Sequence, residues 1–428
     1  MTFFIHTFGC QMNVSDSEKM RHLLVRRGFV EAPTAEGAAL VIVNTCAVRA
    51  KSRDKVFSYA GRLPKSARVI VTGCVAQAEG RDLLARHPRV AAVVGPHQLY
   101  RIDEIALEVL AGSPAVAATG FTRAWQEAVP DLADRDSRVT GYVSIMEGCD
   151  NFCSYCIVPF TRGREKNRPL PAILDEAREL DRQGFAEIVL LGQNVNHWHD
   201  PDGPAGFPAL LEQLAAATSI PWIRFITSYP GYHDPRLVEV MAANPRIARF
   251  IHFPAQSGSS RVLARMARRY SRAEYLRIIA DFRRAIPDLP FSSDFIVGFP
   301  GESEHDFDLT LSLLEKVRFT SIFSFVYSPR PRTKAFPLPD AVPLARKKER
   351  LKRLQDLQES IQLADNRRLI GTVLPVLVTG PSPKVPAERI GRTESYRVVH
   401  FPSDAAAGSF VPVRITQAGP HSLRGVPA

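Results

Sequence analysis

Three closely spaced cysteines constrain this chain more than any other feature of its sequence. Cys149, Cys153 and Cys156 form a Cys-x3-Cys-x2-Cys run, with an aromatic residue directly before the last cysteine. Each of the four irons in a cubane 4Fe-4S cluster needs a ligand, so three thiolates leave one iron without a protein partner. An open position on a metal is a place where a small molecule binds and reacts. The run therefore predicts a 4Fe-4S cluster that takes part in chemistry.

Two other uses of the cysteines fit the sequence less well. A structural zinc site needs a fourth ligand, and the run lacks the paired Cys-x2-Cys or His-x3-His partner expected for one. The chain has six cysteines in all, enough for three disulfides. Its N-terminus is predicted to be a strand rather than a signal peptide, so we expect a cytoplasmic location in which thiols stay reduced.

The cysteine run resembles the motif of the radical S-adenosylmethionine (SAM) superfamily. The resemblance implies that Cys149, Cys153 and Cys156 are catalytic and that the open iron of their cluster binds the amino and carboxylate groups of SAM. It also implies a reaction that begins when the cluster gives one electron to SAM and a 5′-deoxyadenosyl radical is released.

Length and charge limit the remaining possibilities. A chain of 428 residues is long enough for two or three domains. The net charge of +11 suits a polyanionic partner such as nucleic acid, although an ordinary basic surface fits that charge equally well. No stretch approaches the roughly 18 continuous apolar residues of a membrane helix, so we expect no membrane contact.

Apolar, β-branched runs alternate with helical patterns over residues 1–115. Such runs are typical of buried parallel strands, so this region is predicted to be an open parallel α/β sheet domain. Ser15 and Glu18 have the spacing of a capping box, which predicts the start of the first helix at that point. The predicted strands span residues 3–8, 39–44 and 68–72.

A cysteine follows each of these three predicted strands. They are Cys10, Cys46 and Cys74. Because ligands bind at the carboxyl ends of the strands in an open parallel sheet, we expect the three side chains to converge at one edge. Three thiols gathered there predict a second 4Fe-4S cluster, again with one open iron.

The sequence around the same three cysteines resembles the methylthiotransferase family. The resemblance lies in residues 7–13, 44–49 and 73–77, each of which contains one cysteine. In that family the N-terminal domain holds an auxiliary cluster that carries the sulfur to be inserted. The resemblance implies the same role for this trio.

Residues 135–364 are predicted to form the central domain, after a weakly patterned segment, 113–137, that is predicted to be a linker. Strand candidates alternate there with amphipathic helical stretches. This pattern predicts a partial (β/α)6 barrel whose active residues lie at the carboxyl ends of its strands. The strand candidates span residues 142–146, 187–191, 222–226, 249–253, 291–297 and 321–326.

Glycines and polar residues follow these strands. Glycine lets a backbone approach a ligand closely, and amide and hydroxyl side chains supply hydrogen bonds for an adenosine and a methionine tail. Many superfamily members have a Gly-Glu pair where this chain has Gly192-Gln193, so we expect another group to bind the amino group of SAM. Superfamily resemblance places five residues near SAM: Gln193, Ser228, Gln256, Asp294 and Ile296.

Two arginines, Arg162 and Arg164, flank a glycine just past the cysteine run. Cationic side chains at this place either meet a phosphate or the carboxylate of SAM, or lie on a solvated face. The sequence leaves both interpretations open.

The last part of the chain points to RNA. Residues 341–365 have a long basic helical pattern, and residues 365–428 contain the short β runs of a small barrel. The motifs at 391–399 and 421–425 resemble a TRAM domain, an RNA-binding module of RNA-modifying enzymes. The resemblance assigns RNA binding to Arg392, Arg397 and Arg424.

The resemblance to methylthiotransferases now covers nearly the whole chain. Residues 190–196 and the motif that begins at Gly391 fit the MiaB type of this family better than its sisters. That type adds a methylthio group to carbon two of isopentenyladenosine, next to the anticodon of tRNA, with SAM and two 4Fe-4S clusters. The implied partners are a tRNA anticodon stem-loop and an electron donor such as a flavodoxin or ferredoxin, and we expect a monomer.

Three other functions stay open. Two belong to sister methylthiotransferases, which modify threonylcarbamoyladenosine in tRNA or an aspartate of a ribosomal protein. The third is that of a non-catalytic iron–sulfur protein that binds RNA, which would make no 5′-deoxyadenosine from SAM.

Overall fold

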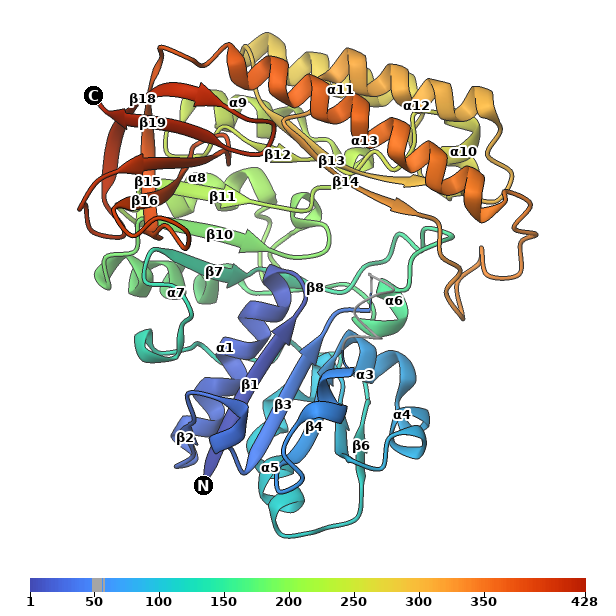
Figure 1. Cartoon of the computed structure of the whole chain (residues 1–428), viewed down its shortest axis with the longest axis vertical. Coiled ribbons are helices and arrows are strands. Elements are labelled where there is room, and N and C mark those ends of the chain that lie inside the picture. The colour runs from blue at the N-terminus through green and yellow to red at the C-terminus, as the bar shows by residue number, and fades with distance from the viewer. Residues whose placement is uncertain (48–55, 57) are drawn as a thin grey trace.

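A computed structural model of the chain describes residues 1–47, 56 and 58–428 (Figure 1). It contains an N-terminal parallel sheet with helices on both faces, a central incomplete barrel, and a small closed β-barrel at the C-terminus. The mixed α/β fold class predicted from the sequence is confirmed. Residues 48 and 49 of the second cysteine motif lie outside the described residues.

The N-terminal sheet has six parallel strands in the order β2-β1-β3-β4-β5-β6. Along β3, Leu40 and Ile42 pack on one face, and Val41 and Val43 pack on the other. Burial on both faces explains the continuous apolar runs and confirms the three predicted strands. The strands are β1 (Thr2–Phe8), β2 (Val30–Glu31), β3 (Leu40–Thr45), β4 (Arg68–Gly73), β5 (Val90–Val94) and β6 (Val116–Ala118). The described helices are α1 (Gln11–Arg26), α3 (Cys74–Glu79), α4 (Arg81–Arg86) and α5 (Ile102–Leu110).

Two local predictions in this region are wrong. Helix α1 begins at Gln11, and its cap is the hydrogen bond that the Cys10 amide donates to Asn13 Oδ1 at 3.3 Å. Ser15 and Glu18 are therefore buried inside the helix instead of opening it, because this face of α1 packs against the central region. The predicted linker also contains strand β6, which pairs with β5 and completes the sheet.

The central region has six parallel strands in two hydrogen-bonded sets, β7-β10-β11 and β12-β13-β14. The Ser228 amide donates to the carbonyl of His252 at 3.1 Å and joins the two sets. This arrangement confirms the predicted partial barrel. The strands are β7 (Thr140–Ser144), β10 (Glu187–Leu191), β11 (Trp222–Phe225), β12 (Ile251–His252), β13 (Phe291–Val297) and β14 (Ser321–Val326).

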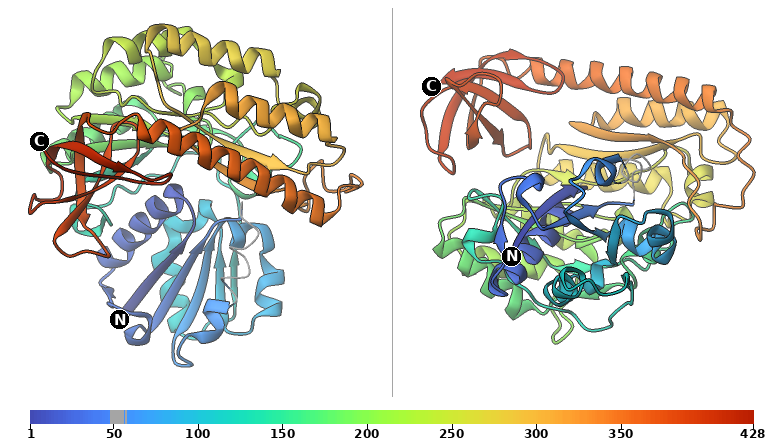
Figure 2. Two further views of the ribbon diagram at one scale, coloured as in Figure 1. Left: turned by 45° about the horizontal axis from the view of Figure 1, so that its top comes forward. Right: turned by 60° about the horizontal axis from the view of Figure 1, so that its bottom comes forward.

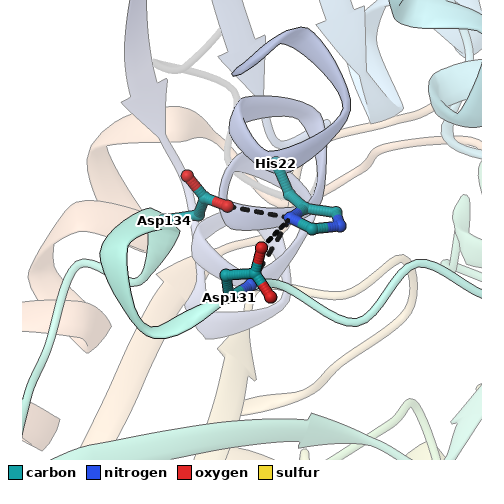
Figure 3. Close-up of side chains that lie close together, drawn as sticks. All are labelled: His22, Asp131 and Asp134. Atoms are coloured by element: carbon teal, nitrogen blue, oxygen red, sulfur yellow. Dashed lines mark hydrogen bonds and ion pairs between the residues drawn. The ribbon is translucent and has the colours of Figure 1, made fainter. Parts of the chain in front are cut away.

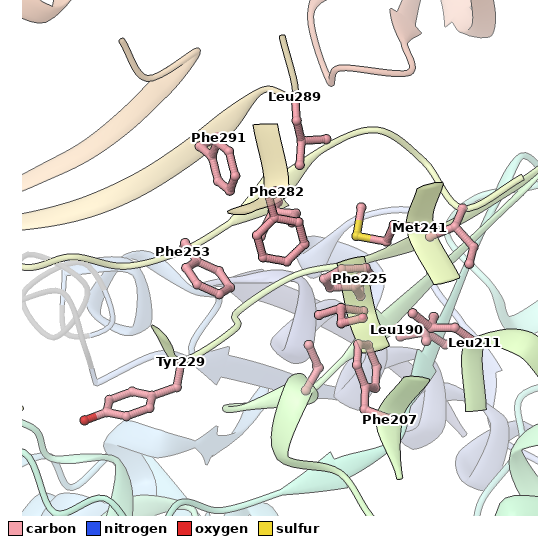
Figure 4. Close-up of a cluster of buried hydrophobic side chains, with 14 of the residues drawn as sticks. Leu190, Phe207, Leu211, Phe225, Tyr229, Met241, Phe253, Phe282, Leu289 and Phe291 are labelled. Atoms are coloured by element: carbon pink, nitrogen blue, oxygen red, sulfur yellow. The ribbon is translucent and has the colours of Figure 1, made fainter. Parts of the chain in front are cut away.

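Helices cover the outside of the central region, and a core of aromatic and aliphatic side chains lies between these helices and the strands (Figure 4). Phe282 meets Phe253 and Phe291 edge to face, with ring centroids 6.2 Å and 5.9 Å apart. Burial of each large apolar side chain stabilises the fold by roughly 1.5–3 kcal/mol, so this core fixes the strands whose carboxyl ends carry the site. The helices are α7 (Leu170–Arg182), α8 (Phe207–Ala217), α9 (Pro235–Ala243), α10 (Ser260–Arg265), α11 (Arg272–Ala285) and α12 (Glu304–Val317).

Short elements shape the loops near the site. Strand β8 (Met146–Glu147) pairs with β9 (Lys166–Asn167) in antiparallel fashion, and α6 (Val158–Thr161) lies between them along the chain. The 3-10 helices are η1 (Ala35–Gly37), η2 (Pro96–Arg101), η3 (Leu132–Asp134), η4 (Val195–His197) and η5 (Pro230–Tyr232).

Helix α13 (Leu344–Arg367) runs beside β14 and α12 and leads into the C-terminal barrel (Figure 2). The barrel closes in the order β15-β16-β17-β19-β18. Its strands are β15 (Val373–Pro381), β16 (Glu388–Thr393), β17 (Val398–Pro402), β18 (Phe410–Ala418) and β19 (Leu423–Pro427). Among the described residues, no helix has the length and apolar character needed to cross a membrane.

The turn between β16 and β17 attaches the barrel to the central region. Tyr396 stacks on Phe250, with ring centroids 5.2 Å apart and planes 19° apart. The guanidinium of Arg224 lies 4.5 Å from the Tyr396 ring, and its Nη1 donates to the Glu394 carbonyl at 2.8 Å. Because Arg224 is buried on β11, the barrel is fixed to the core of the central region.

Candidate active site

The three N-terminal cysteines converge at one edge of the sheet. Cys10, Cys46 and Cys74 follow β1, β3 and β4, which are neighbours in the sheet. A hydrogen bond with Cys46 lowers the pKa of the Cys10 thiol to about 6. Burial raises the pKa of Cys74, and the nearby charge of Cys10 raises it further. Thiols close enough to interact in this way form the donor set that an iron–sulfur cluster requires.

Asparagines and a glycine shape the backbone around this trio. Asn13 Nδ2 donates to Asn44 Oδ1 at 3.0 Å, and Asn44 Nδ2 returns a hydrogen bond to the Asn13 carbonyl at 2.8 Å. Gly73 has a φ of 87°, and a Cβ there would lie 2.5 Å from Asn44 Oδ1. Only glycine fits this position without displacing the network that links the three cysteine loops.

Arg162 reaches this trio from the central region. Its guanidinium forms ion pairs with Asp16 on α1 and, at 3.2 Å, with Glu147 on β8. Only 3% of the arginine is exposed. Burial raises the pKa of Cys74, and the positive charge of Arg162 opposes that rise. Arg162 thus connects the two regions and places a cation beside the N-terminal thiols.

The prediction that allowed a solvated face for both arginines is wrong for Arg162. Its partner Asp16 lies 146 positions earlier in the chain, so no local pattern reveals the pair. Arg164 is 74% exposed in its side chain and forms an ion pair with Asp150 at 2.9 Å.

The second trio occupies the loop that follows β7 and β8. The Asn194 amide donates to Cys149 Sγ at 3.2 Å, and Gln193 Oε1 accepts from the Gly148 amide. Burial raises the pKa of Cys149 and raises that of Cys156 to about 12. Neighbouring thiols add to both shifts, which shows that Cys149, Cys153 and Cys156 also converge.

Arg268 lies against this second trio. Its Nη1 is 3.6 Å from Cys153 Sγ, and its Nε donates to the Tyr270 hydroxyl at 2.9 Å. The guanidinium lies 4.3 Å from the centroid of the Tyr229 ring and 5.0 Å from that of Tyr270. The sequence analysis missed this residue, whose partner Cys153 lies 115 positions earlier.

Three of the residues predicted to contact SAM, Gln193, Ser228 and Gln256, lie just past the carboxyl ends of central strands. The other two, Asp294 and Ile296, lie within β13. Ser228 fits a ligand contact best, since its hydroxyl is buried and has no hydrogen-bond partner among the described residues. Thr227 and Gln256 both have a φ of 71°, an uncommon backbone conformation for residues other than glycine. Strained backbone of this kind gathers at ligand sites, so the edge fits SAM.

The other predicted SAM contacts have partners within the protein. Gln193 holds the cysteine loop through Gly148, as described above. Asp294 Oδ2 lies 3.5 Å from His252 Nε2, and Ile296 joins a small apolar cluster with Tyr155. Contact of these side chains with SAM stays a prediction.

The three arginines assigned to RNA binding differ in the contacts that their side chains already make within the protein. Arg392 lies over the Tyr396 ring at 4.5 Å. Arg397 Nε donates to Asn366 Oδ1 at 2.9 Å, so this arginine ties the barrel to α13. Arg424 is about half exposed and pairs with the glutamate that begins β16. RNA binding by these three residues stays a prediction, and Arg397 has a structural role in addition.

Among the described residues, His22, Asp131 and Asp134 form the one group of three whose ligand atoms approach closely enough for a metal ion (Figure 3). Both carboxylates face the same ring nitrogen of His22, with Asp134 Oδ2 at 2.8 Å and Asp131 Oδ2 at 3.5 Å. The Asp131 amide also points to that nitrogen, at 3.4 Å. This geometry is a hydrogen-bonded clamp between α1 and the segment before β7.

Known proteins match all three regions. Residues 143–314 match the Radical SAM superfamily, residues 2–95 match Uncharacterized protein family UPF0004, and residues 367–428 match the TRAM domain. The chain is similar in fold to the radical S-adenosylmethionine methyltransferase TsrM from Kitasatospora setae, with a TM-score of 0.57 and 15% identity over 78% of this chain and 74% of that one.

Full-length relatives have one printed name in common, tRNA-2-methylthio-N(6)-dimethylallyladenosine synthase. The protein of that name from Geobacter metallireducens is 45% identical over 99% of this chain and 97% of its own length. Its counterpart from Erythrobacter litoralis is 41% identical over 99% of this chain and 96% of its own length. With both cysteine trios in place at the strand ends, the chain belongs to the methylthiotransferase family of radical SAM enzymes.

Proposed function

We propose that this protein adds a methylthio group to carbon two of isopentenyladenosine next to the anticodon of tRNA. One observation carries the proposal: two separate cysteine trios, each with an arginine against it, lie at the strand ends of two adjoining α/β regions. Radical chemistry alone requires one trio. A second trio suits a reaction in which sulfur must also be supplied, and the full-length relatives are named for such a reaction.

We propose two 4Fe-4S clusters, a SAM-bound one at Cys149, Cys153 and Cys156 and an auxiliary one at the N-terminal trio. When bound, the clusters and SAM supply the radical that activates the unreactive C–H bond and the sulfur that replaces its hydrogen. Three thiols at each place leave one iron open in each cluster.

The protein's own residues orient these groups. Gln193 fixes the backbone at Gly148, and Asn194 donates to Cys149, so the second trio is held from β10. The unpartnered hydroxyl of Ser228 offers a hydrogen bond to SAM. Arg162 joins the central region to the N-terminal region through Asp16, and Glu147 on β8 holds the arginine in place.

We propose three domains, residues 1–115, 135–364 and 365–428, with tRNA held by the last one. The net charge of +11 and the TRAM match of residues 367–428 support an RNA partner. We further propose a cytoplasmic monomer that receives electrons from a flavodoxin or ferredoxin.

Analysis of modified nucleosides tests this function. Total tRNA from a deletion strain should lack 2-methylthio-isopentenyladenosine and accumulate isopentenyladenosine, as measured by mass spectrometry. Re-expression of the wild-type gene should restore the product, and re-expression of the Cys153→Ala variant should not. Unchanged levels of the 2-methylthio nucleoside in the deletion strain would rule the proposal out. Loss of the threonylcarbamoyl counterpart instead would assign the protein to the sister branch.

A further inference from the structure

An open cavity of about 530 Å³ lies directly beside the second cysteine trio. It is lined by residues from the loop before β7, strand β9, and the loops around η4. Asp150 is both a lining residue and the neighbour of Cys149. The cavity has the size of a small-molecule site, and none of its lining residues belongs to the predicted SAM contacts.

Two side chains that line this cavity each contain a buried acceptor oxygen without a partner among the described residues. Glu165 Oε1 is held by His197 Nδ1 at 2.6 Å, but Oε2 of the same carboxylate has no partner, although the side chain is only 7% exposed. Asn167 Oδ1 is likewise buried without a partner. A buried acceptor without a donor is unfavourable by roughly 1–3 kcal/mol, so the wall is built for a ligand that donates hydrogen bonds.

Flat rings frame these acceptors. His197 stacks on Tyr232 with centroids 3.8 Å apart and planes 14° apart, and the Tyr232 hydroxyl donates to Asn151 Oδ1 beside the cysteine run. Trp125 and His199 also line the cavity. Aromatic rings next to hydrogen-bonding groups are the means by which proteins bind unstacked RNA bases.

Other occupants fit this cavity less well. The lining has three carboxylates against two cations, Arg123 and Lys166, so its charge disfavours a phosphate. The carboxylates are those of Asp150, Glu165 and Asp202. A metal ion would need three ligand atoms in close approach, and within the described part of the chain that condition holds at His22, Asp131 and Asp134 instead. A neutral planar ligand with N–H donors suits both the charge and the rings.

We infer that this cavity binds a second nucleobase of the RNA, one that flanks the modified adenosine in the loop. The inference rests on the proposed function, because it takes RNA as the substrate. The base carries an exocyclic amino group, as in adenine, guanine or cytosine, which donates to Glu165 Oε2 and Asn167 Oδ1. Uracil lacks such a group and presents mainly acceptors. The cavity would thus select the sequence around the target.

The test is a set of anticodon stem-loop RNAs, each with one loop nucleotide made abasic. Binding to the reconstituted holoenzyme with SAM is measured by fluorescence anisotropy. For the wild type, one abasic position other than the target should weaken binding about tenfold, and uridine at that position should weaken it similarly. In Glu165→Gln, the same abasic change should weaken binding by less than about twofold. The matched control, Glu212→Gln on α8, should retain the tenfold loss.

The bound iron content and the circular dichroism spectrum verify that Glu165→Gln is folded. His199→Ala, which alters an exposed part of the lining, serves as a second variant. It should also reduce the effect of the abasic change to less than about twofold. Equal abasic effects in wild type and both variants at every flanking position would overturn the inference. The inference would also be overturned if the variants changed the abasic effect at the target adenosine and at no other position. A wild type that methylthiolates RNA without the coupling refutes the cavity assignment only, whereas a wild type that binds no RNA refutes the proposed function as well.

Discussion

The two cysteine trios occupy similar places in two α/β regions, but the groups that surround the arginine beside each trio are different. Arg162 is buried, and its ion pairs with Asp16 and Glu147 balance its charge, although Glu147 also pairs with Lys166 at 3.4 Å. Arg268 lies over tyrosine rings, and among the described residues no carboxylate forms an ion pair with it. A cluster at the second trio therefore feels an unbalanced cation, and a cluster at the first does not. Since net charge sets cluster potentials, the second site should accept an electron more readily.

The largest effects should come from the cysteines themselves. Cys153→Ala should abolish formation of 5′-deoxyadenosine from SAM, because the radical-forming cluster loses a ligand. Cys74→Ala should keep that activity and lose methylthio transfer. Each variant should lose about four irons of about eight after anaerobic reconstitution. Liquid chromatography of the two products and iron analysis provide the readouts.

If both variants lost SAM cleavage, the division of labour between the trios would be wrong. If Cys74→Ala kept the full iron content of the wild type, no cluster would be held at the N-terminal trio.

Removal of the balanced arginine should destabilise the fold. Arg162→Gln leaves Asp16 buried without its cation and leaves Glu147 with Lys166 alone. We therefore expect the free energy of unfolding to fall by about 3–5 kcal/mol. Arg164→Gln is the matched control, since its exposed pair with Asp150 contributes less than about 1 kcal/mol. Urea denaturation of the reconstituted proteins measures both. Similar losses in the two variants would contradict the role of Arg162 as the connection between the regions.

Glu18 extends the comparison on the N-terminal side, where its carboxylate is buried within α1. Burial raises the pKa of Glu18 from 4.5 to about 7. The folded protein then binds more protons than the unfolded chain between these values, so stability should fall as pH rises from about 4.5 to 7. Glu18→Gln should remove this dependence and be more stable at pH 8 by about 3 kcal/mol. Thermal unfolding across this pH range checks it, and parallel profiles for the two proteins would refute it.

The smallest effect should be electronic. Arg268→Gln removes the cation 3.6 Å from Cys153 Sγ, and we expect the reduction potential of the cluster at this trio to fall by about 50 mV. Arg269→Gln, which changes the exposed neighbouring arginine, should leave the potential unchanged. Potentiometric titration followed by electron paramagnetic resonance measures the shift. A larger decrease in Arg269→Gln than in Arg268→Gln would reverse the assignment.

Local patterns in the sequence predicted the cysteine trios and the positions of the main strands along the chain. Cys10, Cys46 and Cys74 directly follow apolar strands, and strand ends are visible in a few residues of sequence. The capping box of Ser15 and Glu18 failed for the opposite reason, since a local pattern was overridden when that face of α1 was buried against another region.

The contacts of the two arginines at the site could not be predicted from local patterns. Arg162 meets Asp16 across 146 positions and Arg268 meets Cys153 across 115. No periodicity specifies pairs that form only when separate regions pack. The unpartnered carboxylate oxygen of Glu165 likewise depends on how several segments pack around the cavity, so no single segment of the sequence reveals it.

The stacking of Tyr396 between the barrel and the central region has a consequence for substrate shape. A barrel anchored by Phe250 and Arg224 has little freedom to swing, so the span from its surface to the reaction edge is preset. The nucleic acid must then supply the bending that the enzyme does not. We expect stem-loops stiffened by extra base pairs to be poor substrates even when every recognised nucleotide is present.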